Sequence, residues 1–410
     1  MRILYLTQWF DPEPNVIKGT AFVRALGAAG HEVTVVTGLP NYPTGKLYRV
    51  YRLRLFQQET IDGVRVVRLP LYPSHDASSL RRSLNYLSFF LSALAYCLFR
   101  RRSFDLAYVY HPPITVGLAA ALAGLIRRLP FVLDVQDLWP DTLAATGMAG
   151  GASLARLIGP LCKFVYRRSA AIMVQSDGMK STLINRGVPV GKISTLLNWA
   201  DVPRLPALSK GQGEGPFTVV YGGNLGRAQG LETLITAAAL VQRDRSDIRI
   251  QLYGDGVEVQ SLQIVAADAG VTILSFEGRC SSREMVSIFG KADALFMHLA
   301  DDPLFAITVP SKTQFYLAMG RPIVAGVAGD AARLLDRSGA ALVVTPGDSA
   351  ALAQALCTMA DMPTAERDAL GASGRHFYLD HLSFEGGVGE TLKLIERVCA
   401  EAARRRLMTA

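Results

Sequence analysis

The segment Thr218–Ile235 constrains the fold of this chain more than any other stretch. Its first residues form an apolar run suited to a β-strand, and after a turn the apolar residues recur at helical spacing. The turn contains Gly222, Gly223, Gly226 and Gly230. Such a turn exposes backbone N–H groups at a helix N-terminus, where the helix dipole favours an anion and the missing Cβ atoms admit a phosphate. Met1–Gly30 has a related strand–loop–helix shape, so the sequence predicts two α/β domains that face a shared cleft.

Strand-like runs alternate with helical tracts along almost the whole chain. Most of these runs are continuously apolar, which is typical of strands buried on both faces of a parallel sheet. In the first half they are Ile3–Thr7, Val33–Thr37, Val64–Leu69, Leu106–Tyr110, Phe131–Val135, Ala171–Val174 and Ile193–Leu196. In the second half they are Thr218–Tyr221, Ile248–Tyr253, Val271–Phe276, Ala294–Leu299, Pro322–Ala325 and Ala341–Val344. The alternation predicts an α/β fold.

The chain has 410 residues, enough for two domains with substantial cores. The stretch Ser209–Pro216, rich in glycine and polar residues, predicts an exposed linker or loop. We therefore expect an N-terminal domain over residues 1–200 and a C-terminal domain over residues 204–376. The last helix, Phe384–Arg406, is long enough to pack back across both domains, and we expect residues 377–410 to complete the first one.

Composition argues against several classes of protein. The five cysteines are scattered and none belongs to a C-x-x-C pair, which indicates a reducing compartment and disfavours a structural zinc. The formal net charge of +8 comes mainly from short basic clusters, and no nucleic-acid-binding motif accompanies them. Phosphorylated substrates or an anionic membrane surface explain the charge better. The chain opens directly into a strand, so we expect no secretory signal.

Six motifs occur in order along the chain. They are QWFDPEP at 8–14, GLPNYPTGKLY at 38–48, DVQDLWPD at 134–141, NWAD at 198–201, GGNLGRAQGLETL at 222–234 and PSKTQFYLAMGRPIV at 310–324. Together they resemble the GT-B-fold, family-four retaining glycosyltransferases of bacterial surface-polysaccharide biosynthesis. That branch includes the fucosaminyltransferase-like enzymes of O-antigen and capsule assembly.

The resemblance implies two Rossmann-like domains, with parallel sheets facing a central cleft and a C-terminal helix that returns to the N-terminal domain. It implies a nucleotide-sugar donor held mainly by the C-terminal domain and an acceptor held by the N-terminal one. Transfer would retain the anomeric configuration and would need no obligatory metal or other cofactor. The acceptor would be a polyprenyl-diphosphate-linked glycan of lipopolysaccharide or capsule assembly, at the cytoplasmic face of the bacterial plasma membrane.

Lys312 is the first candidate for donor binding and catalysis. Pro310-Ser311-Lys312 leads into a helix, so Ser311 can cap the helix while Lys312 places an ammonium at its start. A diphosphate leaving group needs this combination of a fixed cation and a helix N-terminus. An ordinary surface lysine is the alternative. Further donor contacts are expected from Gly223, Asn224, Arg227, Gly254, Asp255 and Arg279, with solvated side chains or a plain strand-to-helix turn as the alternatives.

The acidic pair of the family, E-x7-E, is missing. By alignment to the tract before Ala318-Met319-Gly320, its two places fall near Ile307 and Phe315. Neither side chain can accept a hydrogen bond from a ribose or sugar hydroxyl. We expect Gln314, another residue or the backbone to make this contact. A less polar pocket would suit a UDP-linked deoxy- or acetamido-sugar as the donor.

In the N-terminal half, two candidates follow strands at their carboxyl ends, the usual ligand side of a parallel sheet. Asp137 follows Phe131–Val135, and its carboxylate would orient or polarise the attacking hydroxyl, unless it only caps a turn. His111 follows Leu106–Tyr110, with a purely structural histidine as the alternative. The first loop would close over the donor phosphates or the acceptor, and its candidate contacts are Asn15, Lys18 and Gly19.

Leu84–Phe99 is a run of mostly apolar residues flanked on both sides by arginines, namely Arg81, Arg82, Arg100, Arg101 and Arg102. A span needs about 20 apolar residues, and the run is shorter. It therefore predicts an interfacial helix that enters one leaflet through residues such as Phe89, Phe90 and Leu91. Lys46–Phe56 interleaves cations and aromatic residues and would add attraction for anionic lipid. A buried crossover helix is the alternative.

Three other classes of protein fit parts of the sequence. Nucleotide-sugar 2-epimerases share the architecture, but they need several acid/base side chains in the cleft and the sequence offers few. A dinucleotide-dependent oxidoreductase would need a clean G-x-G-x-x-G turn followed by an acidic residue at a strand end, and neither turn has this pattern. A non-catalytic, membrane-bound assembly subunit would be favoured if donor binding proved absent.

Overall fold

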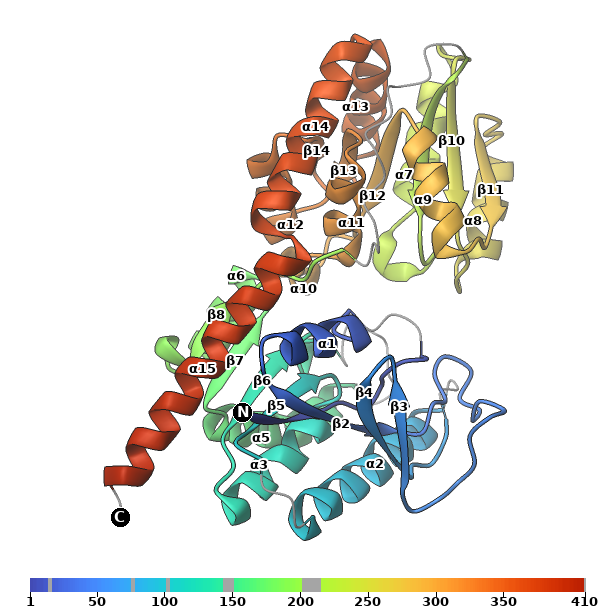
Figure 1. Ribbon diagram of the computed structural model, residues 1–410. Helices are drawn as coiled ribbons and strands as arrows, with labels where there is room; N and C mark the ends of the chain where they lie inside the picture. Colours follow the sequence, from blue (N-terminus) through green and yellow to red (C-terminus); the bar gives the residue numbers. More distant parts are fainter. Residues whose placement is uncertain (14–16, 75–77, 101–103, 143–150, 201–214, 409–410) are drawn as a thin grey trace. The chain divides into compact units, whose positions relative to one another are not determined.

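The computed structural model describes residues 1–13, 17–74, 78–100, 104–142, 151–200 and 215–408. The chain divides into two compact units, each built around its own largely parallel sheet (Figure 1). The first unit comprises Met1–Leu197 and Gly387–Ala410, and the second comprises Asn198–Gly386. The predicted α/β class with two parallel sheets is confirmed.

The first unit holds an eight-stranded sheet in the order β3-β4-β2-β1-β5-β6-β7-β8. Its strands are β1 (Arg2–Leu6), β2 (Glu32–Gly38), β3 (Gln57–Ile61), β4 (Val64–Leu69), β5 (Leu106–His111), β6 (Phe131–Val135), β7 (Ala171–Val174) and β8 (Ile193–Thr195). The helices that connect them are α1 (Thr20–Ala28), α2 (Ser79–Phe99), α3 (Ile114–Arg127), α5 (Gly151–Arg168), α6 (Asp177–Asn185) and the short η1 (Val190–Lys192). Strands β5, β6 and β7 are buried along their whole length, as continuous apolar runs require.

The edge strand β3 is absent from the strands predicted above. It pairs with β4 in antiparallel register, and its residues alternate between half-buried and exposed. Asp62 and Gly63, both with positive φ, make the two-residue turn between the strands. This Asp-Gly pair is the sequence signal that predicts a hairpin.

The second unit holds a six-stranded, fully parallel sheet in the order β11-β10-β9-β12-β13-β14. Its strands are β9 (Phe217–Gly222), β10 (Ile248–Tyr253), β11 (Leu274–Gly278), β12 (Ala294–His298), β13 (Ile323–Gly326) and β14 (Ala341–Val344). The helices are η2 (Arg227–Gln229), α7 (Glu232–Val241), α8 (Val259–Asp268), α9 (Ser282–Lys291), α10 (Pro303–Ala306), α11 (Ser311–Met319), α12 (Gly329–Ser338), α13 (Ser349–Asp361) and α14 (Thr364–His381). A continuous apolar core joins β9, β10 and β12 to α7 and α13.

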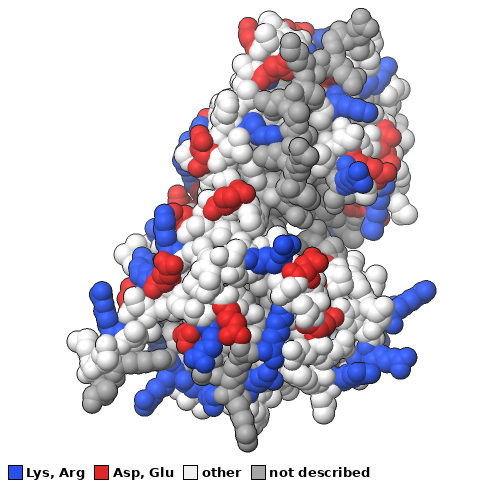
Figure 2. Space-filling model, viewed as in Figure 1, with Lys and Arg blue, Asp and Glu red and all other residues white. Residues whose placement is uncertain are grey.

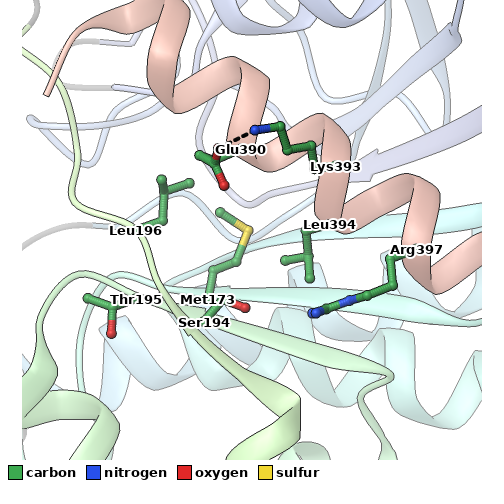
Figure 3. Close-up of a pocket in the computed structure, with 8 residues that line it drawn as sticks. All are labelled: Met173, Ser194, Thr195, Leu196, Glu390, Lys393, Leu394 and Arg397. Atoms are coloured by element: carbon green, nitrogen blue, oxygen red, sulfur yellow. Dashed lines mark hydrogen bonds and ion pairs between the residues drawn. The ribbon is translucent and has the colours of Figure 1, made fainter. Parts of the chain in front are cut away.

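Residues 387–408 of the last helix, α15 (Phe384–Met408), belong to the first unit. Its buried residues there include Leu394 and Ile395. Figure 3 shows this helix beside β7 and β8, where Leu394 and Met173 both line a small cavity of about 200 Å³. The return of the C-terminal helix to the N-terminal unit is confirmed.

Helix α2 corrects one of the membrane predictions. Phe89 is fully buried and points into the first unit, so it cannot enter a leaflet; Phe90 is half-buried. Arg81 is exposed and Arg82 half-buried, the Arg100 guanidinium lies over the rings of Phe56 and Tyr96, and Arg101 falls outside the described residues. Across the described parts of the chain, no helix is both long enough and apolar enough to span a bilayer.

Candidate functional site

In the second unit, the turn after β9 lies against the start of α11. The Lys312 ammonium donates a hydrogen bond to the Tyr221 hydroxyl and lies 4.0 Å from the centroid of that ring. Gly223 has φ +138°, and a Cβ there would come within 2.5 Å of Lys312 Cε. Only glycine therefore permits the lysine to approach the turn so closely. The structure brings Lys312 and Gly223 together, as a shared donor site requires.

Burial changes the chemistry of Lys312. Because its ammonium is withdrawn from water, the pKa of Lys312 falls to about 7. Tyr221, which accepts its hydrogen bond, donates its own proton to the carbonyl of Asn224 at 2.5 Å. An anion that bound here would favour the protonated lysine and raise this pKa again.

The start of α11 carries no side-chain cap. Pro310 is the N-cap residue, and no side chain hydrogen-bonds the first turn from that position. The predicted cap, Ser311, is instead the first helical residue and is exposed, so that part of the prediction is wrong. An uncapped helix start leaves N–H groups and the positive end of the dipole for an anion.

Gln314, predicted to reach the donor, is fully buried beneath the first turn of α11. With its amide nitrogen turned toward the backbone, it donates to the carbonyls of Pro310 and Ser311 at 2.8 and 3.2 Å. Its position therefore supports the helix start that carries Lys312 and does not present an amide to a ligand.

A second glycine loop packs directly on the first. Cβ atoms at Gly254 and Gly256 would overlap the carbonyls of Gly223 and Leu225, respectively. Two N–H groups of the first turn are already bonded to this loop, from Gly223 to the Tyr253 carbonyl and from Leu225 to the Asp255 carbonyl, both at 2.9 Å. The glycines thus serve backbone-to-backbone packing as well as any phosphate contact.

Arg227 and Arg279 lie on the outside of these loops. Arg227 pairs with Glu258 at 3.0 Å and Arg279 with Asp255 at 2.8 Å, and the arginine side chains are 89% and 80% exposed. Surface pairs of this kind contribute little free energy, so both cations can turn toward a ligand. Beside Arg279, a cavity of about 200 Å³ has an apolar floor that includes Leu252 and Phe276.

The two positions of the missing acidic pair are apolar in the fold as well. Ile307 is the C-cap residue that follows α10, and it is half-buried. Phe315 is half-buried in α11 and packs edge-on against Phe289, with ring centroids 5.7 Å apart. Phe289 in turn lies under Gly222, where a Cβ would come within 2.5 Å of its ring. An apolar wall therefore stands next to Lys312.

His298 is a residue that sequence reasoning missed. It ends β12, is buried, and its Nδ1 lies 2.8 Å from the Gln229 carbonyl while its Nε2 accepts the Gly347 N–H at 3.3 Å. Nδ1 therefore carries the proton, and burial lowers the pKa of His298. A histidine at the end of the apolar run Ala294–Leu299 was the available signal. Through its bond to Gln229, His298 connects the segment that follows the glycine turn to the carboxyl end of β12.

In the first unit, Asp137 and His111 lie at the carboxyl edge of the sheet, as predicted. Burial raises the pKa of Asp137. His111 is fully buried, 6.4 Å from the ring of Trp139, and burial lowers its pKa to about 3. It is neutral at ordinary pH and is a poor proton acceptor there.

Four aromatic rings form a continuous row at this edge. Trp9 contacts Tyr42 and Tyr86 at centroid distances of 6.0 and 6.2 Å, and Tyr86 contacts Trp139 at 6.2 Å. Trp9, Tyr42 and Tyr86 are half-buried, so part of each ring faces outward. Ring faces beside the carboxylate of Asp137 are suited to a ligand with both apolar and hydroxyl-bearing surfaces.

Buried polar groups hold this row in place. Gln8 donates to Asn85 at 2.5 Å, and Asn85 donates to Asn41 at 3.3 Å, which links the loops after β1 and β2 to α2. The Glu13 carboxylate accepts N–H groups of Phe10, Asn41 and Tyr42 at 2.9 to 3.2 Å. Because Gln8, Glu13, Asn41 and Asn85 are buried and Tyr42 is half-buried, the network fixes the loops.

The first loop differs from its prediction. The Lys18 ammonium is buried in an ion pair with Asp134 of β6, which also accepts the Tyr108 hydroxyl. At the start of α1, after Gly19, the Asp11 carboxylate accepts the N–H and hydroxyl of Thr20 at 2.6 and 2.7 Å. An internal carboxylate thus occupies the place expected for a phosphate. Asn15 lies outside the described residues.

The chain therefore has two parallel-sheet units, one with an uncapped helix start beside a half-buried lysine and the other with a row of aromatic rings. Two family models match the chain: a glycosyl transferase 4-like domain over residues 20–199 and a glycosyl transferases group 1 domain over residues 216–362. The chain is a glycosyltransferase with the GT-B fold.

Two relatives described as glycosyltransferases resemble it in sequence. The chain is 27% identical to WbjE of Pseudomonas aeruginosa, described as a glycosyltransferase, over 55% of its own length and 58% of that protein. It is also 27% identical to WcaI of Escherichia coli K12, described as a colanic acid biosynthesis glycosyl transferase, over 78% of its length and 82% of that protein. These relatives give no support to the epimerase alternative.

Solved structures share the fold over nearly the whole chain. Sucrose-phosphate synthase of Thermosynechococcus elongatus superposes with a TM-score of 0.71 at 18% identity, covering 98% of this chain and 99% of that one. HepE of Anabaena, solved with UDP-glucose, superposes with a TM-score of 0.67 at 16% identity, covering 96% and 99%. Both likenesses concern the fold.

Proposed function

We propose that the chain transfers a sugar from a UDP-linked donor to a lipid-linked glycan acceptor during cell-surface polysaccharide assembly. The observation that carries the proposal is Lys312 at the uncapped start of α11, held against Gly223 by its bond to Tyr221. A fixed cation at a helix N-terminus is what a departing diphosphate needs. The UDP-glucose complex of HepE supports a UDP-sugar as the donor.

Transfer proceeds with retention of configuration in this proposal. The bond from the anomeric carbon to the diphosphate oxygen breaks, and the acceptor oxygen bonds to the same face of that carbon. The acceptor proton passes to the leaving diphosphate oxygen, so no protein base is needed, in agreement with the low pKa of His111. Lys312 and the α11 dipole stabilise the charge on the leaving group, and Asp137 orients the attacking hydroxyl.

The remaining contacts divide between the two ends of the donor. Arg227 and the Gly223–Asn224 turn would contact the diphosphate, and Arg279 with Asp255 would border the nucleobase in the cavity floored by Leu252 and Phe276. The apolar residues Ile307 and Phe315 favour a deoxy- or acetamido-sugar, as in the fucosaminyltransferase-like branch, because its methyl groups lose little beside them.

The acceptor in this proposal is a polyprenyl-diphosphate-linked glycan, and the enzyme is peripheral on the cytoplasmic face of the bacterial plasma membrane. The description of WcaI as a colanic acid enzyme supports a surface polysaccharide as the product. The aromatic row of Trp9, Tyr42 and Tyr86 offers ring faces to a glycan.

A panel of nucleotide sugars tests the proposal. UDP-linked members should raise the melting temperature of the protein, because a ligand that binds only the folded state stabilises it. The donor found in this way, incubated with a lipid-linked acceptor, should yield a product whose anomeric configuration by NMR matches that of the donor. If no nucleotide sugar shifts the melting temperature, a non-catalytic assembly subunit becomes the better reading; an inverted product would exclude the retaining mechanism.

A further inference from the structure

We infer that one face of the first unit docks on an anionic lipid bilayer and places the aromatic row at the level of the lipid headgroups. We call it the docking face; it consists of Leu84, Leu87 and Leu91 of α2 together with Val50, Leu53 and Leu55 of the segment 46–56. The inference deepens the proposed function and rests on its lipid-linked acceptor.

Helix α2 has two apolar sides, and only one of them is covered. Asn85, Phe89 and Ala93 recur every four residues and are buried against the first unit. On the other side, Leu87 and Leu91 are 50% and 57% exposed, and they continue a leucine stripe at spacings of three and four residues. A surface helix normally places polar residues on its outer side, so this stripe indicates a second apolar environment.

The segment 46–56 extends the same surface. Leu53 and Leu55 are 63% and 89% exposed. Its end is fixed to α2, since Phe56 stacks on Tyr96 with ring centroids 6.5 Å apart. Leu53 also lines an open cavity of about 320 Å³ with Tyr72 and Ser88, a largely apolar groove beside α2.

The charges around the docking face identify its partner. Neither residues 46–56 nor residues 78–100 contain an acidic residue, whereas the first segment alone holds Lys46, Arg49, Arg52 and Arg54, all exposed. In Figure 2 the margin of the first unit where the 46–56 loop of Figure 1 lies carries basic side chains on an otherwise uncharged surface. Apolar side chains among cations match an anionic headgroup layer, while a second copy would bring like charges together.

The same helix connects this face to the aromatic row. Asn85 and Tyr86 lie in the N-terminal half of α2, where Asn85 bonds Gln8 and Tyr86 contacts Trp9 and Trp139. The lipid-facing stripe and the row are therefore two sides of one helix. A diphosphate at headgroup level would meet the row without leaving the bilayer surface.

Vesicle sedimentation of the full chain tests the docking face. The protein should sediment with vesicles that contain phosphatidylglycerol and much less with phosphatidylcholine alone or at high salt. Leu84→Ser/Leu87→Ser/Leu91→Ser should abolish binding to the anionic vesicles. Arg52→Gln/Arg54→Gln should weaken it, by roughly fivefold per cation.

The matched control is Ile264→Ser, which removes an equally exposed apolar residue (61%) from α8 of the second unit and should bind vesicles like the parent. UDP binding and melting temperature should be unchanged in all three variants, so misfolding or failure of the donor site is detected separately. Unaltered vesicle binding by the leucine variant, or a parent chain that never sediments, overturns the inference. So does a leucine variant that changes only self-association in sedimentation velocity.

Discussion

At the scale of single residues, Lys312 favours binding of the donor but lowers the stability of the folded protein without it. Its side chain is half-buried beside Gly223 and its ammonium bonds a neutral tyrosine hydroxyl, so the loss of water around the charge is only partly compensated. The pKa of about 7 expresses this imbalance. A bound diphosphate would supply the missing negative charge, so the cost is removed when the donor is in place.

Lys312→Met is expected to reduce transfer by about 10²- to 10³-fold at saturating donor, because a group that stabilises leaving-group charge is lost. Steady-state kinetics with a UDP-sugar measures this. Lys312→Arg keeps a charge and serves as the comparison. Turnover of the methionine variant near that of the parent would remove Lys312 from the mechanism.

The affinity for UDP should fall as the pH rises above about 7, because binding then requires Lys312 to take up a proton. The slope can reach about tenfold per pH unit while one full proton is taken up. In Lys312→Arg the guanidinium stays charged, so the slope should be lost. Calorimetric titration of the parent and of Lys312→Arg with UDP at several pH values above 7 measures both slopes. Equal slopes would mean that Lys312 is not the group that takes up the proton.

The same residue predicts a pH-dependent stability. The folded pKa of about 7 lies below the ordinary lysine value, so between them the unfolded chain binds more protons and stability rises with pH. Lys312→Met should therefore melt at a higher temperature than the parent below pH 7, and the difference should shrink toward pH values of about 10. Thermal melts of both proteins below pH 7 and near pH 10 measure this difference in melting temperature. A difference that does not change with pH would argue against a lowered pKa of Lys312.

The missing acidic pair predicts weak discrimination against deoxyribose. Carboxylates make strong charge-assisted bonds to ribose hydroxyls, and Ile307 and Phe315 cannot. UDP should therefore bind less than about tenfold more tightly than dUDP, a difference below about 1.4 kcal/mol. Competition binding decides this. A much larger preference would mean that another side chain contacts the ribose.

At the scale of elements, patterns local in sequence predicted most of the fold. Most apolar runs matched the strands, because a buried parallel strand needs little beyond continuous hydrophobicity; the run Val271–Phe276 was displaced from β11 (Leu274–Gly278). β3 was missed because its residues, at a sheet edge, are largely polar; only Asp62-Gly63 marked it. In α2 the apolar run was nearly uniform, so it could not show that Phe89 faces the core and Leu87 faces outward.

The site was predictable where a short motif carries its own signal, as the glycine turn after β9 and the Pro-Ser-Lys start of α11 do, and not where a side chain is engaged by a partner from another element. The Gly223 turn and Lys312 do lie together. In contrast, Lys18 is engaged by Asp134 from another strand, and the start of α1 by Asp11. Those pairings follow from the tertiary fold, and no spacing in the chain reveals them.

The packing of the two glycine loops gives a prediction about backbone geometry. Gly254→Ala should destabilise the second unit by roughly 2–4 kcal/mol, since φ is +139° and the added Cβ would overlap the Gly223 carbonyl. The displaced turn should also lower UDP affinity. Gly290→Ala in α9, where a Cβ meets open space, is the control and should be neutral or slightly stabilising. Denaturant unfolding measures the free energy of unfolding of both variants. An equal loss of stability in Gly254→Ala and Gly290→Ala would contradict the prediction.

At the scale of the whole molecule, the first unit is built from two segments that are separated in the sequence by the second unit. The first unit takes its last helix from the far end of the chain, after the second unit is complete. Each sheet has its own core, and the residues that we propose bind the donor lie in the second unit while the aromatic row lies in the first. Loss of stability in one unit should therefore leave the ligand chemistry of the other intact.

Thermal unfolding of the full chain should show two transitions, because two cores of this size unfold as separate cooperative units. UDP should raise the melting temperature of the second unit only. At a UDP concentration of a hundred times Kd, the free energy of unfolding of that unit should increase by about 2.7 kcal/mol. Ile395→Ala empties a fully buried site of α15 and should lower only the other transition, by about 2–5 kcal/mol of stability. Ala400→Ser, exposed on the same helix, should change neither. Differential scanning calorimetry of the parent with and without UDP, and of the Ile395→Ala and Ala400→Ser variants, measures these shifts. A single transition that both UDP and Ile395→Ala shift together would mean that the units unfold as one.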